Sequence, residues 1–215
     1  MGMSPAQRPD STRRLAVEAL ETEVVTALNA AIGAFDRLAQ RLACGVEPAA
    51  VAPNRFDARR AGELRKRTVA MLARARPGDL RRVAAVLHAT GCLQRLGARL
   101  ALLDGLAPSL IGAWSGDDRL RQAVELELIA TRRWLVRARD AVSIGAGAAP
   151  PRRVPRAVDG GPGRSVLALA EAAQARGPSG QAAVCALSSL ADVLDHISVD
   201  AGSIAGGLAI ACAVR

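Results

Sequence analysis

The sequence predicts an all-α protein of six helices, arranged as two pseudo-repeated three-helix bundles. Half of the 215 residues are hydrophobic, yet aromatic residues make up only 2% and tyrosine is absent. Such an aliphatic composition favours helices over a β-sandwich, which draws on β-branched and aromatic residues. No stretch alternates with a period of two, so no strands are predicted. The order of long, short and medium helix occurs twice, with a break near Pro108, which indicates an internal duplication.

The first half, residues 1–107, is expected to hold three helices. A helix over 11–44 is predicted from apolar residues at alternating spacings of four and three, which is typical of a helix packed lengthwise in a bundle. A second helix over 56–76 is expected to end at Pro77 and Gly78. The third begins with Asp79 as its N-cap and is expected to break at Gly105 and Pro108. The apolar seam of the first helix comprises Leu20, Val24, Leu28, Ala31, Phe35, Leu38 and Leu42.

The second half, residues 108–215, is expected to repeat this order. A helix is predicted to start near Asp117 or Asp118 and to end before Gly145. Residues 145–164 are so rich in proline and glycine that they predict an irregular linker. A short helix over 165–176 and a last helix from Ser179 toward the C-terminus follow. Three glycines of this last helix are interpreted as places of close helix contact, namely Gly202, Gly206 and Gly207.

Charge and cysteine content limit the classes of function. A net charge of +9 suggests nucleic acid, but the arginines are scattered along several helices and the chain lacks the aromatic residues of single-strand binders. Nucleic-acid binding is therefore the weaker alternative. The four cysteines form no C-x-x-C pair and are interpreted as small buried hydrophobes in a reducing cytosol. No secretory signal is visible, and the longest apolar stretch, 204–214, is too short for a bilayer span. We expect a cytoplasmic protein with no integral membrane segment.

Catalytic chemistry is not expected. His88 and His196 are the only histidines, and His88 has no acidic residue three or four positions away that would orient it as a base. No nucleophile elbow, phosphate-binding loop or H-E-x-x-H pattern occurs. The sequence therefore predicts no enzyme, no catalytic residue and no cofactor.

Two segments carry a resemblance to a known family. Residues 77–103 resemble the third helix of the PhoU family, regulators of bacterial phosphate uptake, whose typical form reads D-L-R and later D-L-E-R-I-G-D. Residues 186–208 are similar to the family's sixth helix, with its L-E-R-I-A-D-H-A-x-N-I-A-E core. The matching residues are Asp79, Leu80, Arg81, Leu93, Arg95, Leu96 and Gly97 in the first segment, and Leu194, Ile197, Ala201, Ile204 and Ala205 in the second.

The resemblance implies two three-helix bundles related by a pseudo-twofold axis, but this chain departs from the family's metal motifs. In the family, carboxylates four residues apart bind clustered metal ions. Here Gln94 and Ala98 stand at those positions in the first segment. In the second segment Asp195 keeps the first acid, Val199 replaces the next, and Asp200 stands where histidine is usual. No bound metal is therefore expected, and Asp195 and Asp200 are interpreted as solvated or capping acids whose side chains point about 140° apart.

The resemblance implies a regulator that acts by protein contact. The family's partners are the sensor histidine kinase of the phosphate response and the ATPase of the phosphate transporter, so contact with a membrane would be indirect. A homodimer is expected. The alternative is a helical adaptor or scaffold unrelated to phosphate. Six arginines on the first and fourth helices are candidates for partner contact or, equally, for solubility alone: Arg13, Arg14, Arg132, Arg133, Arg137 and Arg139.

Overall fold

Every secondary-structure element in the described part of the chain is an α-helix. The computed structural model describes residues 8–44, 56, 58–114, 118–145 and 178–212. Its helices are α1 (Arg8–Cys44), α2 (Ala58–Leu72), α3 (Pro77–Trp114), α4 (Asp118–Gly145) and α6 (Pro178–Cys212). No strand occurs within these ranges. The all-α prediction is confirmed for this part of the chain. The expected linker from residue 146 onward and the expected helix over 165–176 lie outside the described residues.

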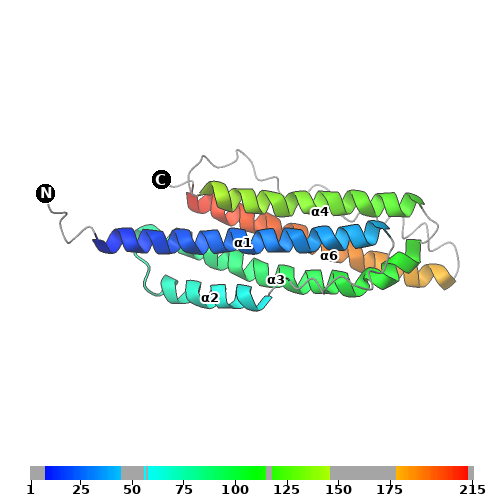
Figure 1. Ribbon diagram of the computed structural model, residues 1–215, viewed down its shortest axis with the longest axis horizontal. Helices are drawn as coiled ribbons and strands as arrows, with labels where there is room; N and C mark the ends of the chain where they lie inside the picture. Colours follow the sequence, from blue (N-terminus) through cyan, green and yellow to red (C-terminus); the bar gives the residue numbers. More distant parts are fainter. Residues whose placement is uncertain (1–7, 45–55, 57, 115–117, 146–177, 213–215) are drawn as a thin grey trace.

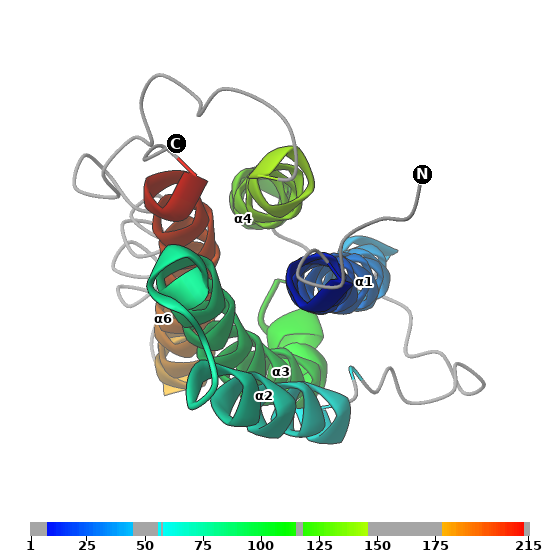
Figure 2. The same cartoon turned by 90° about the vertical axis from the view of Figure 1, so that its left-hand side faces the viewer.

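Four long helices close a ring. α1 packs on α3 and α4, and α6 packs on the same two helices, so α1 and α6 stand diagonally across the ring. Figure 2, which looks along the bundle, shows this ring with α2 outside it, lying on α3. α1 and α3 run in one direction, and α4 and α6 run in the opposite direction (Figure 1). α3 and α6 are thus antiparallel neighbours.

One aliphatic core runs through the ring. The seam predicted for the first helix is buried, with Leu28 and Phe35 fully so. Leu96 and Leu103 of α3, and Leu194 of α6, are also fully buried in the same cluster, to which all five described helices contribute. Burying each such side chain stabilises the fold by about 1.5–3 kcal/mol. Among the described residues, no helix is both long and apolar enough to cross a membrane.

The expected break of the third helix at Gly105 and Pro108 is wrong, because α3 continues through Pro108 to Trp114. A proline inside a helix removes one backbone donor and crowds the carbonyl four residues earlier. Here the flanking Ala107 and Leu110 are fully buried in the core, and this tertiary packing holds the helix together. The last turns of α3 bend away from its main axis (Figure 1). The expected domain boundary at 107/108 therefore lies within one helix.

Smaller expectations also need correction. α2 ends at Leu72 and not near residue 76, because the amides of Arg74 and Ala75 bond back to carbonyls three residues earlier and tighten the chain into a turn. Among the three cysteines whose burial the structure describes, Cys92 is buried, whereas Cys44 and Cys185 are exposed. Gly207 and Gly202 do allow close contact, with His88 and Trp134 respectively, but Gly206 has open space around it.

Candidate functional site

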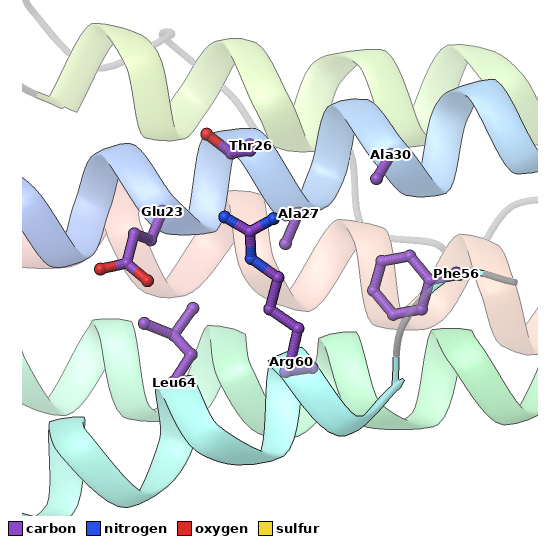
Figure 3. A pocket seen from close by; sticks show the side chains of 8 residues that line it. Glu23, Thr26, Ala27, Ala30, Phe56, Arg60 and Leu64 are labelled. Atoms are coloured by element: carbon purple, nitrogen blue, oxygen red, sulfur yellow. The ribbon is translucent and has the colours of Figure 1, made fainter.

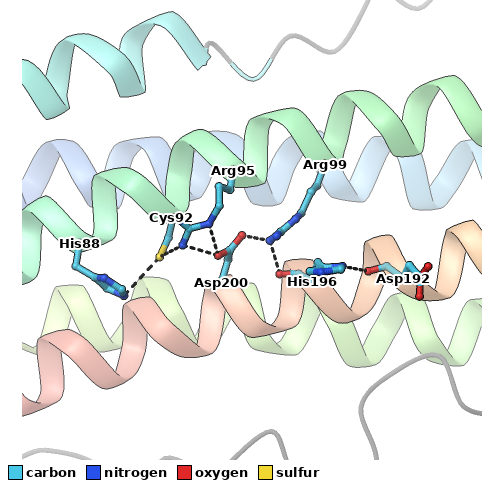
Figure 4. A network of polar contacts seen from close by, with 7 residues as sticks. All are labelled: His88, Cys92, Arg95, Arg99, Asp192, His196 and Asp200. Atoms are coloured by element: carbon cyan, nitrogen blue, oxygen red, sulfur yellow. Dashed lines mark hydrogen bonds and ion pairs between the residues drawn. The ribbon is translucent and has the colours of Figure 1, made fainter.

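The helices that carry the two motif segments are neighbours in the ring. Residues 77–103 lie in α3 and residues 186–208 lie in α6. Because the two helices are antiparallel, Arg95 and Arg99 of α3 stand opposite Asp200 and His196 of α6 (Figure 4). The α3–α6 interface thus brings together polar side chains from both segments.

Asp200 is the centre of this interface. Its side chain is only 4% exposed, and its carboxylate accepts hydrogen bonds from two arginines of α3. Arg95 donates from Nε and from a terminal nitrogen to Oδ1, at 2.9 and 2.8 Å. Arg99 donates to Oδ2 and also to the backbone oxygen of His196, the latter at 2.6 Å. Asp200 therefore joins α6 to α3 at two successive turns of α3.

The interpretation of Asp200 as a solvated or capping acid is wrong. Asp200 lies on the apolar side of α6, between Ile197 and Ile204, which are fully buried. A carboxylate in such a place needs a charged partner, and the two arginines provide it. Asp195 is exposed on another side of the same helix, as a separation of five residues predicts. The two acids do not converge.

The cluster carries more positive than negative charge. Arg99 is 18% exposed, and desolvation together with repulsion by Arg95 lowers its pKa, although a guanidinium remains charged under all ordinary conditions. The side chain of Arg95 is 52% exposed and keeps contact with water. Arg99 is consequently the buried half of the arginine pair, and its charge depends on Asp200 for compensation.

Cys92 completes the network on the α3 side. Its Sγ lies 3.1 Å from a terminal nitrogen of Arg95 and 3.6 Å from Nε2 of His88. Burial raises the pKa of the Cys92 thiol, and the nearby arginine only partly opposes this effect. A nucleophilic cysteine needs a thiolate and access to substrate, whereas this thiol is kept protonated and is fully buried. The arrangement supports a clamp between helices and gives no support to catalysis by Cys92.

The remaining family positions are dispersed. Gln94 is half-buried beneath α2, and its side-chain oxygen accepts a hydrogen bond from Arg65 at 3.0 Å. Ala98 and Val199 are exposed. Across the part of the chain that the structure describes, no three or more histidine, cysteine or carboxylate side chains gather in a way that would hold a metal ion.

The six candidate contact arginines have different surroundings. Arg132 bonds both oxygens of Asp36 at 2.7 and 3.1 Å and so ties α4 to α1. Arg14 pairs with Glu18, and Arg139 pairs with Asp140. The guanidinium of Arg137 lies 5.2 Å from the ring centre of Trp134, in cation–π range. Arg133 is exposed, and the side chain of Arg13 lies outside the described residues.

Sequence reasoning missed the Arg95–Asp200–Arg99 clamp, although a signal for it exists. Arg95 and Arg99 are one turn apart on a helix that is otherwise mainly apolar, and Asp200 falls on the apolar stripe that Ile197 and Ile204 define. An acid on a stripe expected to be buried requires a cation from a facing helix. Because α3 and α6 are far apart in the sequence, the sequence alone does not identify that cation.

Comparison of the chain with protein-family models, curated proteins and solved structures gave no match.

Proposed function

We propose that the chain is a PhoU-like regulator of phosphate uptake and phosphate-responsive signalling, which acts by protein contact and without catalysis. The observation that carries this proposal is that the two motif-bearing helices, α3 and α6, are antiparallel neighbours in a ring of four. In the absence of a family match, the proposal rests on the residues of the two segments and on this arrangement.

The ring has the neighbour pattern that a duplicated three-helix unit would have. Exchanging α1 with α4, and α3 with α6, turns the α1–α3 contact into the α4–α6 contact and leaves the α1–α4 and α3–α6 contacts unchanged. The same exchange preserves the directions within each half, since each first helix is parallel to its third (Figure 1). This pattern supports the two-repeat organisation that the resemblance implies.

The α3–α6 clamp supports action without metal. In the family, carboxylates on these helices bind metal ions, whereas here two guanidiniums and one carboxylate occupy the interface between them. The helices are held by the chain's own charges, so the surface they present does not depend on a bound ion. Such a protein regulates a partner by binding one of its conformations more tightly than another.

The test is retention of partners in the presence of a chelator. The tagged protein is used to capture the phosphate-sensing histidine kinase and the phosphate-transport ATPase from the same cell, and phosphate-responsive gene expression is measured in a deletion strain. We expect at least one of the two proteins to be retained, with altered phosphate-responsive expression that the restored gene corrects. If neither protein is retained and the deletion changes neither phosphate uptake nor the response, the phosphate role is wrong and a general helical adaptor is the better description.

A further inference from the structure

A groove runs between α1 and α2. α2 packs chiefly on α3 and has few contacts with α1, among them the ion pair of Arg67 with Glu23. On one side of this pair lies a cavity of about 150 Å³ (Figure 3), and on the other lies one of about 430 Å³. The lining of the first includes Ala27, Ala30, Arg60 and Leu64, and that of the second includes Val17, Arg67, Met71 and Arg74.

Arginines stand along the α2 side of the groove at a regular interval. Arg60, Arg67 and Arg74 are each seven residues apart. Seven residues are about two helical turns and about 10 Å, so side chains at this spacing point the same way. All three are exposed and line the two cavities. Arg74 lies in the turn after α2, where its amide donates a hydrogen bond to the carbonyl of Met71 and the backbone keeps coiling in the same sense as the helix.

The same region holds most of the net charge of the protein. Residues 58–82 contain nine arginine or lysine residues and two acids, and therefore supply seven of the nine net positive charges. An excess of charge confined to one edge of a bundle attracts a partner of opposite charge and speeds its encounter.

We propose that the α1–α2 groove docks an acidic amphipathic helix of a partner protein. Aliphatic side chains of the partner enter the two cavities, whose linings include Ala27 and Leu64 in one and Val17 and Met71 in the other. Carboxylates about four turns apart on the same helix pair with Arg60 and Arg74, while Arg67 keeps its ion pair with Glu23. Helices with anchors at such intervals bind grooves of this kind.

The groove favours a protein helix over nucleic acid and over a lipid surface. Its linings are largely hydrocarbon between the arginines, and a phosphate backbone has no apolar groups to place against them. The apolar side of α2, with Ala61 and Leu64, is already buried in the core and is not available to enter a bilayer. The acidic helix uses both the arginines and the apolar linings. This inference rests on the proposed action by protein contact and is independent of the phosphate assignment.

The probe is a synthetic helical peptide of about three heptads, with leucine at the first and fourth positions and one glutamate per heptad flanking them. A matched peptide carries lysine in place of each glutamate. Fluorescence anisotropy with the full chain is expected to show saturable binding of the glutamate peptide and none of the lysine peptide. Double-stranded DNA and anionic phosphatidylglycerol vesicles are measured in the same way.

Three variants test the site. Arg60→Glu with Arg74→Glu is expected to weaken peptide binding by about tenfold for each arginine. Arg119→Glu with Arg121→Glu makes the same charge change on exposed positions of α4, on the opposite side of the bundle from α2 (Figure 2), and is expected to leave binding within about twofold. Ala30→Trp fills the smaller cavity from an exposed position without changing charge and is expected to reduce binding at least fivefold. Circular dichroism checks that each variant is folded.

Three results would overturn the inference. The first is equal binding of the glutamate and lysine peptides. The second is an equal loss of peptide affinity in the α2 and α4 charge variants. The third is tighter binding of DNA or vesicles than of the peptide, together with no effect of Ala30→Trp. If the α2 variant loses the peptide but the cell's kinase and transporter ATPase are not retained by the wild type, the groove stands and the phosphate role fails. If they are retained equally by the α2 variant, the phosphate role stands and the groove fails.

Discussion

Replacing Asp200 by asparagine should destabilise the protein strongly, because it removes the carboxylate that compensates the charge of the buried Arg99 in the α3–α6 clamp. Asparagine keeps the shape of the side chain and one acceptor oxygen, so packing changes little. Breaking a buried ion pair by removing one partner costs about 3–5 kcal/mol. Arg95 is half exposed and can turn into water, whereas Arg99 is 18% exposed and cannot do so easily. We therefore expect the lower end of that range, about 3 kcal/mol.

Urea unfolding followed by circular dichroism measures this loss. For a chain of this size, about 3 kcal/mol corresponds to a fall in melting temperature of about 6–12 °C. Asp192→Asn on the same helix is the matched control, since Asp192 is exposed and its removal should change stability by less than about 0.5 kcal/mol.

A double replacement distinguishes the loss of charge compensation from a general sensitivity of this position to substitution. Arg99→Met combined with Asp200→Leu removes both buried charges and should be less destabilised than Asp200→Asn alone, since hydrocarbon of similar volume often replaces a buried ion pair at no loss. The reasoning is refuted if Asp200→Asn is as stable as Asp192→Asn. It is also refuted if the double replacement costs the sum of the two single changes.

Three further predictions concern other features of the fold. The hydrogen bond from Arg67 lowers the pKa of Glu23 from its usual 4.5, so the ionised carboxylate stabilises the fold above that value and the stabilisation is lost as the pH falls through the depressed pKa. Glu23→Gln should therefore reduce the loss of stability at acidic pH. Urea titrations at several pH values measure this loss, and an unchanged loss in the variant would contradict the prediction. Because Cys92 is buried and its thiol has a raised pKa, iodoacetamide at mildly alkaline pH should label Cys44 and Cys185 in the native protein and Cys92 only in denaturant. Peptide mass spectrometry measures the labelling, and equal labelling of the three cysteines in the native protein would disprove the burial of Cys92. Pro108→Ala should restore a backbone donor inside α3 and raise stability by about 1 kcal/mol or more, and a lower melting temperature would show that the bend is required.

The sequence was sufficient to predict an all-α fold and the buried seam of the first helix, because both depend on local propensity and on the spacing of aliphatic residues. The seam from Leu20 to Leu42 is buried as its spacing predicts. Pro108 shows the limit of such reasoning: its local effect predicts a break, but the burial of Ala107 and Leu110 decides the outcome. That burial comes from neighbouring helices, and no local rule contains it.

The candidate site was predicted only in part. The two motif segments lie in the neighbouring helices α3 and α6, but their family positions Gln94, Ala98 and Val199 do not meet. Asp200 was recognised as unusual and assigned the wrong surroundings. Its partners are about a hundred residues away in the sequence, so only the pairing of helices reveals them. The seven-residue interval of Arg60, Arg67 and Arg74 was visible in the sequence, yet its meaning depends on the cavities beside α1.

The outlying position of α2 has a consequence for hydrogen exchange. This helix is anchored on one side by a few residues, among them Ala61, Leu64 and Thr68, and it lies outside the ring of four helices. Elements attached in this way open locally at a lower free energy than the whole domain unfolds. Amide protons of α2 should exchange faster than those of α3, and each opening uncovers Gln94, which Arg65 otherwise covers. A ligand lying along the groove would slow that exchange selectively, so amide protection in α2 reports occupancy without any label.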